Sequence, residues 1–435
     1  MTYDEALDFI YSRRKFQKSC GHERIERLLE LLGNPQKKLK FVHVVGTNGK
    51  GSVSTALSDV LYESGYKVGL FTSPFVVEFG ERIKVNGEFI PKSEIAEITS
   101  VIRENTLLME KEGLYPTVFE VTTALGLAYY EKTGCDIVVL EAGIGGKNDS
   151  TNVIDAPELA VITSVSVDHM EMLGESITEI AREKCGILKS SCPVVSYPFE
   201  GTDFGYIPQS EEAAKVIKEE CLKGGNPLYL PDTDKLTIES CDLSGTSFCY
   251  DGLSIRINIC GKHQTANMLT VVTAARVLRD KGYSITDSSI QKGIAKFRIP
   301  GRTEIIEGEP TVILDGGHNV GCMKALKETA ESFLKGRKIT LLMSFMKDKE
   351  YEKSIEIIAP LCENIVFTVT DSLRGEKAEV LCETGRKYCK NVYAFYEVRE
   401  ALLYAKEKAG KDVLMVAGSF YLVSEVRGLL NTDCI

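Results

Sequence analysis

The feature that most constrains the fold is a glycine-rich segment between a short β-branched run and an apolar helical pattern. FVHVV (41–45) predicts a strand, and GTNGKGS (46–52) follows it. The next apolar residues recur at helical spacing: Val53, Ala56, Leu57, Val60 and Leu61. In a strand–loop–helix unit of this kind, backbone N–H groups close around a phosphate at the helix N-terminus. We therefore expect Lys50 to reach the outer phosphates. The alternative is a glycine-rich turn with a solvated lysine.

Strand and helix patterns alternate through the following residues. KVGLF (67–71), DIVVLEAG (136–143) and ELAVITSV (158–165) predict strands, separated by helical stretches at 93–112 and 117–132. Such alternation predicts βαβ units and a mostly parallel sheet covered on both faces. Before the glycine-rich loop, the first 35 residues are predicted to be helical, with a stop at Gly33 and Pro35.

The pattern changes after residue 200. Short alternating segments from about 200 to 262 predict a small antiparallel patch, and a helix is expected at 264–281. FRIPGRTE (297–304) has the composition of a linker. Four further apolar strands follow it: TVILD, KITLLMSF, NIVFTV and DVLMVAGS. We therefore expect an α/β protein with a P-loop ATP-binding domain at 1–297 and a Rossmann-like domain at 298–435.

Composition narrows the class of protein. A chain of 435 residues exceeds what one core usually fills, so two domains are expected. The net charge of −10 disfavours a general nucleic-acid binder. The 13 cysteines contain no Cys-x-x-Cys pair and are expected to be reduced thiols. The acidic start lacks the pattern of a signal peptide and no apolar run is long enough for a membrane span, so we expect a cytoplasmic protein.

Two residues at predicted strand ends are candidates for a metal site. Glu141 closes the run IVVLE at the edge where parallel sheets present ligand-binding residues. His169, which follows another predicted strand, could offer an imidazole nitrogen to the same metal. A surface charge and an ordinary loop histidine are the alternatives, and the residues alone leave them open.

Several motifs, in order along nearly the whole chain, resemble the Mur-type amide ligases, in particular the folylpolyglutamate and dihydrofolate synthase branch. Besides the loop, they are FTSPFVVEFGERI, LEAGIGGKNDSTN, SVDHMEMLG, EKCGILK, PGRTE, LDGGHN and SFMKDK. The resemblance implies an ATP-dependent ligase that joins L-glutamate to a folate, or to dihydropteroate. It implies small-molecule partners only, without nucleic acid or membrane, and we expect a monomer.

The resemblance also assigns roles to residues near the loop. It implies that Gly49, Lys50, Gly51 and Ser52 hold the phosphates of ATP. It adds Ser73 to Glu141 and His169 as ligands of Mg²⁺. Lys184, in EKCGILK, is implied to be carbamylated; without the family it would be an ordinary solvated helix lysine. Lys50, Lys184 and His169 are therefore the expected catalytic residues.

Further roles fall on the helix at 264–281 and beyond it. Asn267 is implied to contact adenine, Arg302 the phosphates and Asp315 the ribose. His318 and Ser419 are implied to seat the incoming glutamate, although a serine at a helix start is equally well explained as a cap. Phe75, in TSPF where many members have TSPH, leaves open which folate form is preferred, and DGGHN replaces the commoner DGAHN.

The expected chemistry is activation of a carboxylate as an acyl phosphate, followed by attack of the glutamate amine. Two alternatives remain at this point. A nucleotide-hydrolysing switch would use the same loop but needs no amino-acid site. A muramyl ligase would carry a nucleotide-sugar module before the loop, where only 45 residues stand here.

Overall fold

The computed structural model describes residues 1–14, 21–168, 170–370 and 374–431. Its largest sheet has eight strands in the order β4-β3-β2-β5-β1-β6-β7-β8. These strands are β1 (Phe41–Val45), β2 (Val68–Phe71), β3 (Ile83–Val85), β4 (Glu88–Phe89), β5 (Ile137–Glu141), β6 (Leu159–Ile162), β7 (Val194–Ser196) and β8 (Leu228–Tyr229). Neighbours are parallel except for the antiparallel pairs β2–β3 and β3–β4. The prediction of a mostly parallel sheet is confirmed.

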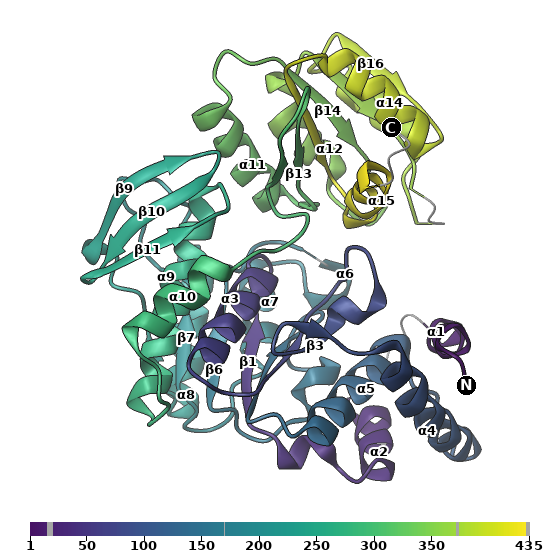
Figure 1. Cartoon of the computed structure of the whole chain (residues 1–435), viewed down its shortest axis with the longest axis vertical. Helices are drawn as coiled ribbons and strands as arrows, with labels where there is room; N and C mark the ends of the chain where they lie inside the picture. Colours follow the sequence, from purple (N-terminus) through teal and green to yellow (C-terminus); the bar gives the residue numbers. More distant parts are fainter. Residues whose placement is uncertain (15–20, 169, 371–373, 432–435) are drawn as a thin grey trace.

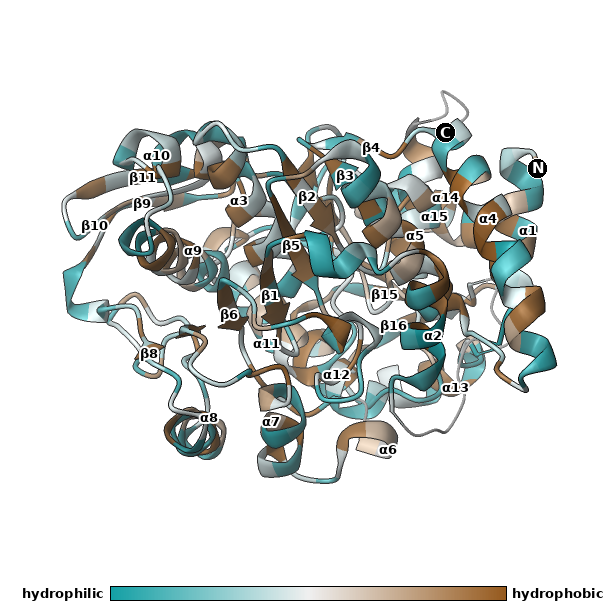
Figure 2. Cartoon of the chain, turned by 90° about the horizontal axis from the view of Figure 1, so that it is seen from below, coloured by the Kyte–Doolittle hydropathy of each residue, from teal (hydrophilic) through white to brown (hydrophobic). Residues whose placement is uncertain are grey.

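Helices cover this sheet on both faces (Figure 2), and for that reason the central strands β1 and β5 are mostly hydrophobic and buried at every position. Val42 and Val44 of β1 face a core shared with α3 (Lys50–Glu63), while Phe41 faces the opposite core. Helices α9 (Lys262–Asp280) and α10 (Asp287–Lys296) also pack on the α3 side. The opposite face carries α1 (Tyr3–Ser12), α2 (Glu23–Leu31), α4 (Lys92–Lys111) and α5 (Val118–Thr133). Near β6 and β7 lie α6 (Met170–Leu173), α7 (Ile177–Cys185) and α8 (Glu211–Gly224).

The predicted antiparallel patch is present as a three-stranded sheet in the order β11-β10-β9. Its strands are β9 (Leu236–Asp242), β10 (Gly245–Tyr250) and β11 (Leu253–Ile257). In β11 alternate residues are buried, as expected for a sheet with one face on the core. The prediction of short alternating segments throughout 200–262 was wrong for α8. That helix is capped by Ser210, whose side chain accepts the N–H of Ala213.

A six-stranded sheet, in the order β12-β13-β17-β14-β15-β16, forms the C-terminal unit (green to yellow in Figure 1). Its strands are β12 (Glu304–Ile306), β13 (Thr311–Leu314), β14 (Ile339–Met343), β15 (Asn364–Phe367), β16 (Asn391–Ala394) and β17 (Val413–Ala417). Its helices are α11 (Val320–Phe333), α12 (Tyr351–Ile358), α13 (Ala378–Gly385), α14 (Val398–Ala409) and α15 (Phe420–Asn431). The four predicted strands are confirmed. The unpredicted β12 and β16 are edge strands, only partly buried.

The N-terminal helical prediction is resolved into α1 and α2, with residues 15–20 outside the described part of the chain. The predicted stop is present: Gly33 has a φ of +81°, and the N–H of Asn34 bonds to the carbonyl of Leu29 at 2.8 Å. Within the described residues, no helix is long and apolar enough to cross a membrane. The boundary between 297 and 298 stays a prediction.

Candidate active site

The glycine-rich loop connects the end of β1 to the first turn of α3, as the sequence predicts. Gly49 is the N-cap of α3, with a φ of +85°. A Cβ atom at this position would lie 2.5 Å from Oδ1 of Asn267, in the second turn of α9. Ser52 is buried in the first turn of α3. Asn267 thus packs directly against the loop predicted to bind phosphates.

Two lysine ammonium groups meet on the carbonyl of Gly46. Nζ of Lys50 lies 3.1 Å from this oxygen and 3.2 Å from the carbonyl oxygen of Thr47. Nζ of Lys184, from α7, donates to Gly46 at 2.8 Å and is only 3% exposed. Burial, together with the charge of Lys50, lowers the pKa of Lys184 to about 7. Lys184 is therefore not the solvated helix lysine that its sequence context alone suggests.

Glu141 ends β5 beside the loop and is 2% exposed. Its Oε2 accepts the N–H of Ser73 at 3.2 Å. A Cβ at Gly51 would lie 3.8 Å from the same oxygen, so the carboxylate faces the first turn of α3. Burial raises the pKa of Glu141 to about 7, against the lowering effect of Lys50, Ser73, Arg302 and Arg82. Glu141 and Ser73 are thus adjacent, whereas His169 lies outside the described residues.

Two further candidates, Arg302 and Asp315, lie at the start of the C-terminal unit. Arg302 acts electrostatically on Glu141, and its guanidinium carbon lies 4.2 Å from the ring centre of Phe420. Asp315 follows β13, and its Oδ2 accepts the N–H and the hydroxyl of Thr303 at 2.9 and 3.0 Å. Its Oδ1 accepts the N–H of Gly317 at 2.7 Å. The ribose role of Asp315 stays a prediction, and the carboxylate also fixes the linker.

His318 and Ser419 lie on the C-terminal unit. Nδ1 of His318 lies 3.2 Å from the carbonyl oxygen of Gly316, and its Nε2 lies 3.6 Å from Oδ2 of Asp168. Ser419 is 2% exposed, and its Oγ accepts the N–H of Tyr421 at 3.1 Å. This hydrogen bond supports the alternative that Ser419 caps the N-terminus of α15. The glutamate role of both residues stays a prediction.

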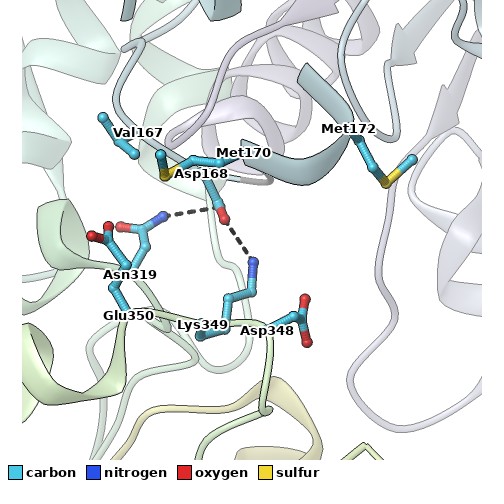
Figure 3. A pocket seen from close by; sticks show the side chains of 8 residues that line it. All are labelled: Val167, Asp168, Met170, Met172, Asn319, Asp348, Lys349 and Glu350. Atoms are coloured by element: carbon cyan, nitrogen blue, oxygen red, sulfur yellow. Dashed lines mark hydrogen bonds and ion pairs between the residues drawn. The ribbon is translucent and has the colours of Figure 1, made fainter. Parts of the chain in front are cut away.

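Sequence reasoning gave no role to a set of side chains that bridge the two units (Figure 3). Lys349 and Asp168 form an ion pair of 2.6 Å, and both side chains are 9% exposed. Nδ2 of Asn319 donates to Oδ1 of Asn48 at 3.0 Å and to Oδ2 of Asp168 at 3.3 Å. Asn48 belongs to the glycine-rich loop, so the C-terminal unit is bonded directly to that loop. Lys349 and Asn319 lie in SFMKDK and LDGGHN, the motifs that could have pointed to them.

A glycine-rich phosphate loop, a buried carboxylate beside it and a second α/β unit bonded to the loop define a class: P-loop enzymes with their site between two units. Comparison with known families places the chain within that class. The profile of the Mur ligase middle domain matches residues 44–275. The profile of the Mur ligase glutamate ligase domain matches residues 301–420.

Individual relatives agree along the full length. A Bacillus subtilis dihydrofolate synthase/folylpolyglutamate synthase is 33% identical over 441 aligned residues, covering 99% of both chains. A Thermotoga maritima folylpolyglutamate synthase structure superposes with a TM-score of 0.83 at 30% identity, covering 100% of this chain and 97% of the other. The structure of Escherichia coli FolC in complex with DHPP and ADP superposes with a TM-score of 0.84 at 26% identity. The match covers 99% of this chain and 98% of the other. The chain belongs to the Mur ligase family, in the folylpolyglutamate and dihydrofolate synthase branch.

Proposed function

We propose that the protein is an ATP-dependent ligase that joins L-glutamate to a carboxylate of a folate, with release of ADP and phosphate. The observation that carries this proposal is the full-length 33% identity to a dihydrofolate synthase/folylpolyglutamate synthase. The two-unit site described above is consistent with it. A reduced folate ending in glutamate is the proposed acceptor, and dihydropteroate is a second candidate.

In this proposal ATP lies between the two units. Gly49, Lys50, Gly51 and Ser52 hold its phosphates, because they form the loop and first turn that present N–H groups at a helix N-terminus. Asn267, Arg302 and Asp315 complete the nucleotide site. The contact between Gly49 and Asn267 supports this placement, since it joins the loop to the predicted adenine contact.

Replacing Gly49 with alanine should weaken nucleotide binding by roughly tenfold or more, because the new Cβ displaces Asn267. Gly65→Ala is the matched control. Gly65 has nearly the same φ, +89°, but has nothing within 4 Å of the added Cβ. Both variants should lose about 1–2 kcal/mol of stability through the left-handed conformation. The shift of the unfolding temperature with ATP separates them, and equal shifts would remove the role given to Asn267.

The described residues fit a Mg²⁺ ion. Glu141 is a buried carboxylate that accepts the N–H of Ser73, and the positive charges of Lys50, Arg302 and Arg82 act on it. Mg²⁺ commonly uses one or two carboxylates with phosphate oxygens and waters, so a dense cluster of protein ligands is not required. Among the described residues, no cluster of three or more Asp, Glu, His or Cys side chains could hold a metal ion. Glu141, Ser73 and His169 would hold the ion, which neutralises phosphate charge when bound.

Mg²⁺ activation should depend on pH through Glu141. With its pKa raised to about 7, the carboxyl is mostly protonated at pH 6, and a proton competes with the metal. The apparent Mg²⁺ affinity should then fall about tenfold per pH unit below 7. Mg²⁺ titrations of turnover at pH 6, 7 and 8 measure this, and Glu141→Gln should show lower affinity with a flatter pH dependence. Parallel pH curves for the two proteins would contradict the assignment.

The chain's own residues then account for the chemistry. Lys50 and Arg302 stabilise negative charge while an oxygen of the folate carboxylate bonds to the γ-phosphorus and the bond to ADP breaks. The glutamate amine, bound near His318 and Ser419, attacks the acyl phosphate carbon, and phosphate leaves as the amine loses a proton. The contacts of Asn319 and Lys349 with the first unit hold the two units together here, and closure of the units would exclude water from the acyl phosphate.

Lys184 is proposed to carry a carbamate. An amine must be neutral to add to CO₂, and a pKa of about 7 makes the neutral form abundant at physiological pH. The carbamate nitrogen keeps one N–H, which can still donate to the carbonyl of Gly46. The change replaces one of two neighbouring positive charges with a negative one, which favours Mg²⁺ nearby.

An assay of phosphate release with ATP, L-glutamate and either tetrahydrofolate or dihydropteroate tests the proposal. Release that needs both glutamate and the acceptor, with a product heavier by one glutamate residue, is expected. Release without glutamate would indicate a nucleotide hydrolase and overturn the proposal.

We further propose that the protein is a monomer in the cytoplasm. The candidate residues belong to one chain, and the cysteines in the described part of it are free thiols.

A further inference from the structure

The guanidinium of Arg82 lies beside the candidate site, and no carboxylate in the described part of the chain forms an ion pair with it. Arg82 ends a 3₁₀ turn (Phe79–Arg82), and its carbonyl accepts the N–H of Thr72 at 3.0 Å. This bond fixes Arg82 next to the Ser73 turn that contacts Glu141. Its guanidinium carbon lies 5.1 Å from the ring centre of Phe75. Within the described residues, the guanidinium makes no hydrogen bond or ion pair.

The two carboxylates near Arg82, those of Glu81 and Glu141, have other partners. Glu81 accepts the backbone N–H groups of Val76, Val77 and Glu78, at 2.8, 2.6 and 3.0 Å. Glu141 interacts electrostatically with Arg82, but it is assigned to Mg²⁺ and faces Lys50 and Arg302 as well. Arg82 therefore supplies a positive charge that no carboxylate of the described residues contacts directly.

The surroundings of this charge are aromatic and come from both units. The ring centres of Phe75 and Phe79 lie 6.4 Å apart, and the ring centre of Tyr11 lies 6.3 Å from that of Phe79. Tyr421 of the C-terminal unit also acts electrostatically on Arg82. A guanidinium stays charged even where burial disfavours the charge, and its planar fork matches a carboxylate. The position thus suits a carboxylate attached to an aromatic ligand.

We propose that Arg82 binds the α-carboxylate of the glutamate already present on a folate, the carboxylate that does not react. This inference rests on the proposed function. The reacting carboxylate must lie near Lys50 and Glu141, and the α-carboxylate is joined to it through Cα, Cβ and Cγ. Arg82 is fixed beside the Ser73 turn, next to Glu141. A folate whose reacting carboxylate lies near Glu141 would place its α-carboxylate there. Dihydropteroate has only its reacting carboxylate, so Arg82 favours glutamate-bearing folates over dihydropteroate.

The test measures KM and kcat of wild type and Arg82→Gln with tetrahydrofolate, its α-carboxamide and dihydropteroate. Loss of a charge-assisted hydrogen bond should raise the KM for tetrahydrofolate roughly 10- to 100-fold. The KM for dihydropteroate should change by less than about threefold. Wild type should bind the α-carboxamide as poorly as Arg82→Gln binds tetrahydrofolate, and the variant should not distinguish acid from amide. Arg82→Lys should restore part of the affinity.

Lys84→Gln is the matched control, because it removes one positive charge two residues away in β3, where the ammonium faces the Phe89 ring. It should leave all three KM values near those of wild type. An equal KM increase for the acid and the amide in Arg82→Gln would overturn the inference, and so would an unchanged KM for tetrahydrofolate. Thermal unfolding of each variant identifies a folding defect. A wild-type protein that ligates no folate would instead overturn the proposed function.

Discussion

Replacing Lys50 with alanine should lower the rate of ligation by at least about 10²-fold while the fold stays intact. Among the described residues, its ammonium bonds only to two carbonyls of its own loop, those of Gly46 and Thr47, so it adds little to the core. In the proposed reaction the same charge stabilises the transferring phosphoryl group, and no other lysine of the loop can replace it. The ligation rate at saturating ATP, with thermal unfolding as a check on folding, measures the effect.

A surface lysine provides the control. Lys215 is exposed on α8, and Lys215→Ala should keep wild-type activity. If Lys50→Ala turned over at a near-normal rate, the assignment of the glycine-rich loop as the phosphate site would be wrong. If its unfolding temperature fell by many degrees, Lys50 would have a structural role that its contacts do not indicate.

Lys184→Ala should be nearly inactive, because it removes the proposed carbamate from a position beside Gly46 and Lys50. Alanine leaves a buried space in which a small carboxylate could replace the carbamate. Formate or acetate should therefore restore part of the activity to Lys184→Ala, and should not stimulate wild type. Inactivity that neither anion relieves, in a variant with normal unfolding, would favour a role for the lysine itself.

The same proposal predicts a pH dependence. With its pKa lowered to about 7, Lys184 is about 90% protonated at pH 6 and about 90% neutral at pH 8. Only the neutral amine adds CO₂, so ¹³C-carbonate labelling of Lys184 should increase as the pH rises through 7. A high-resolution map of a fully active Mg²⁺–nucleotide complex with an unmodified Lys184 would contradict the carbamate.

The main elements of the fold could be predicted because their physical signals are local. Strands buried on both faces, such as β1 and β5, appear as short runs that are mostly apolar and rich in valine, and Gly33 marks a helix end through its positive φ. The edge strands β12 and β16 were missed because they are only partly buried and lack that pattern. Helix α8 was missed because a change to short strands was expected throughout its region.

In the candidate site too, the sequence pattern could place some residues, whereas their contacts depend on tertiary packing. Glu141 could be placed at a strand end by pattern, but its contact with Ser73 depends on the neighbouring strand and could not be read from spacing. Lys184 has an ordinary helical context, and only tertiary packing buries it against Gly46. The ion pair of Asp168 and Lys349 joins residues of different units, so the motif around Lys349 could single out the residue but not its partner.

The central claim is that ATP activates the folate carboxylate by transferring a phosphoryl group to it. The most direct test uses tetrahydrofolate with ¹⁸O in its γ-carboxylate, followed by mass analysis of the phosphate released during ligation. An acyl phosphate leaves one carboxylate oxygen on phosphorus, so each released phosphate should contain one ¹⁸O atom and the new amide the other. Phosphate free of ¹⁸O, formed together with ligated product, would contradict the proposed function.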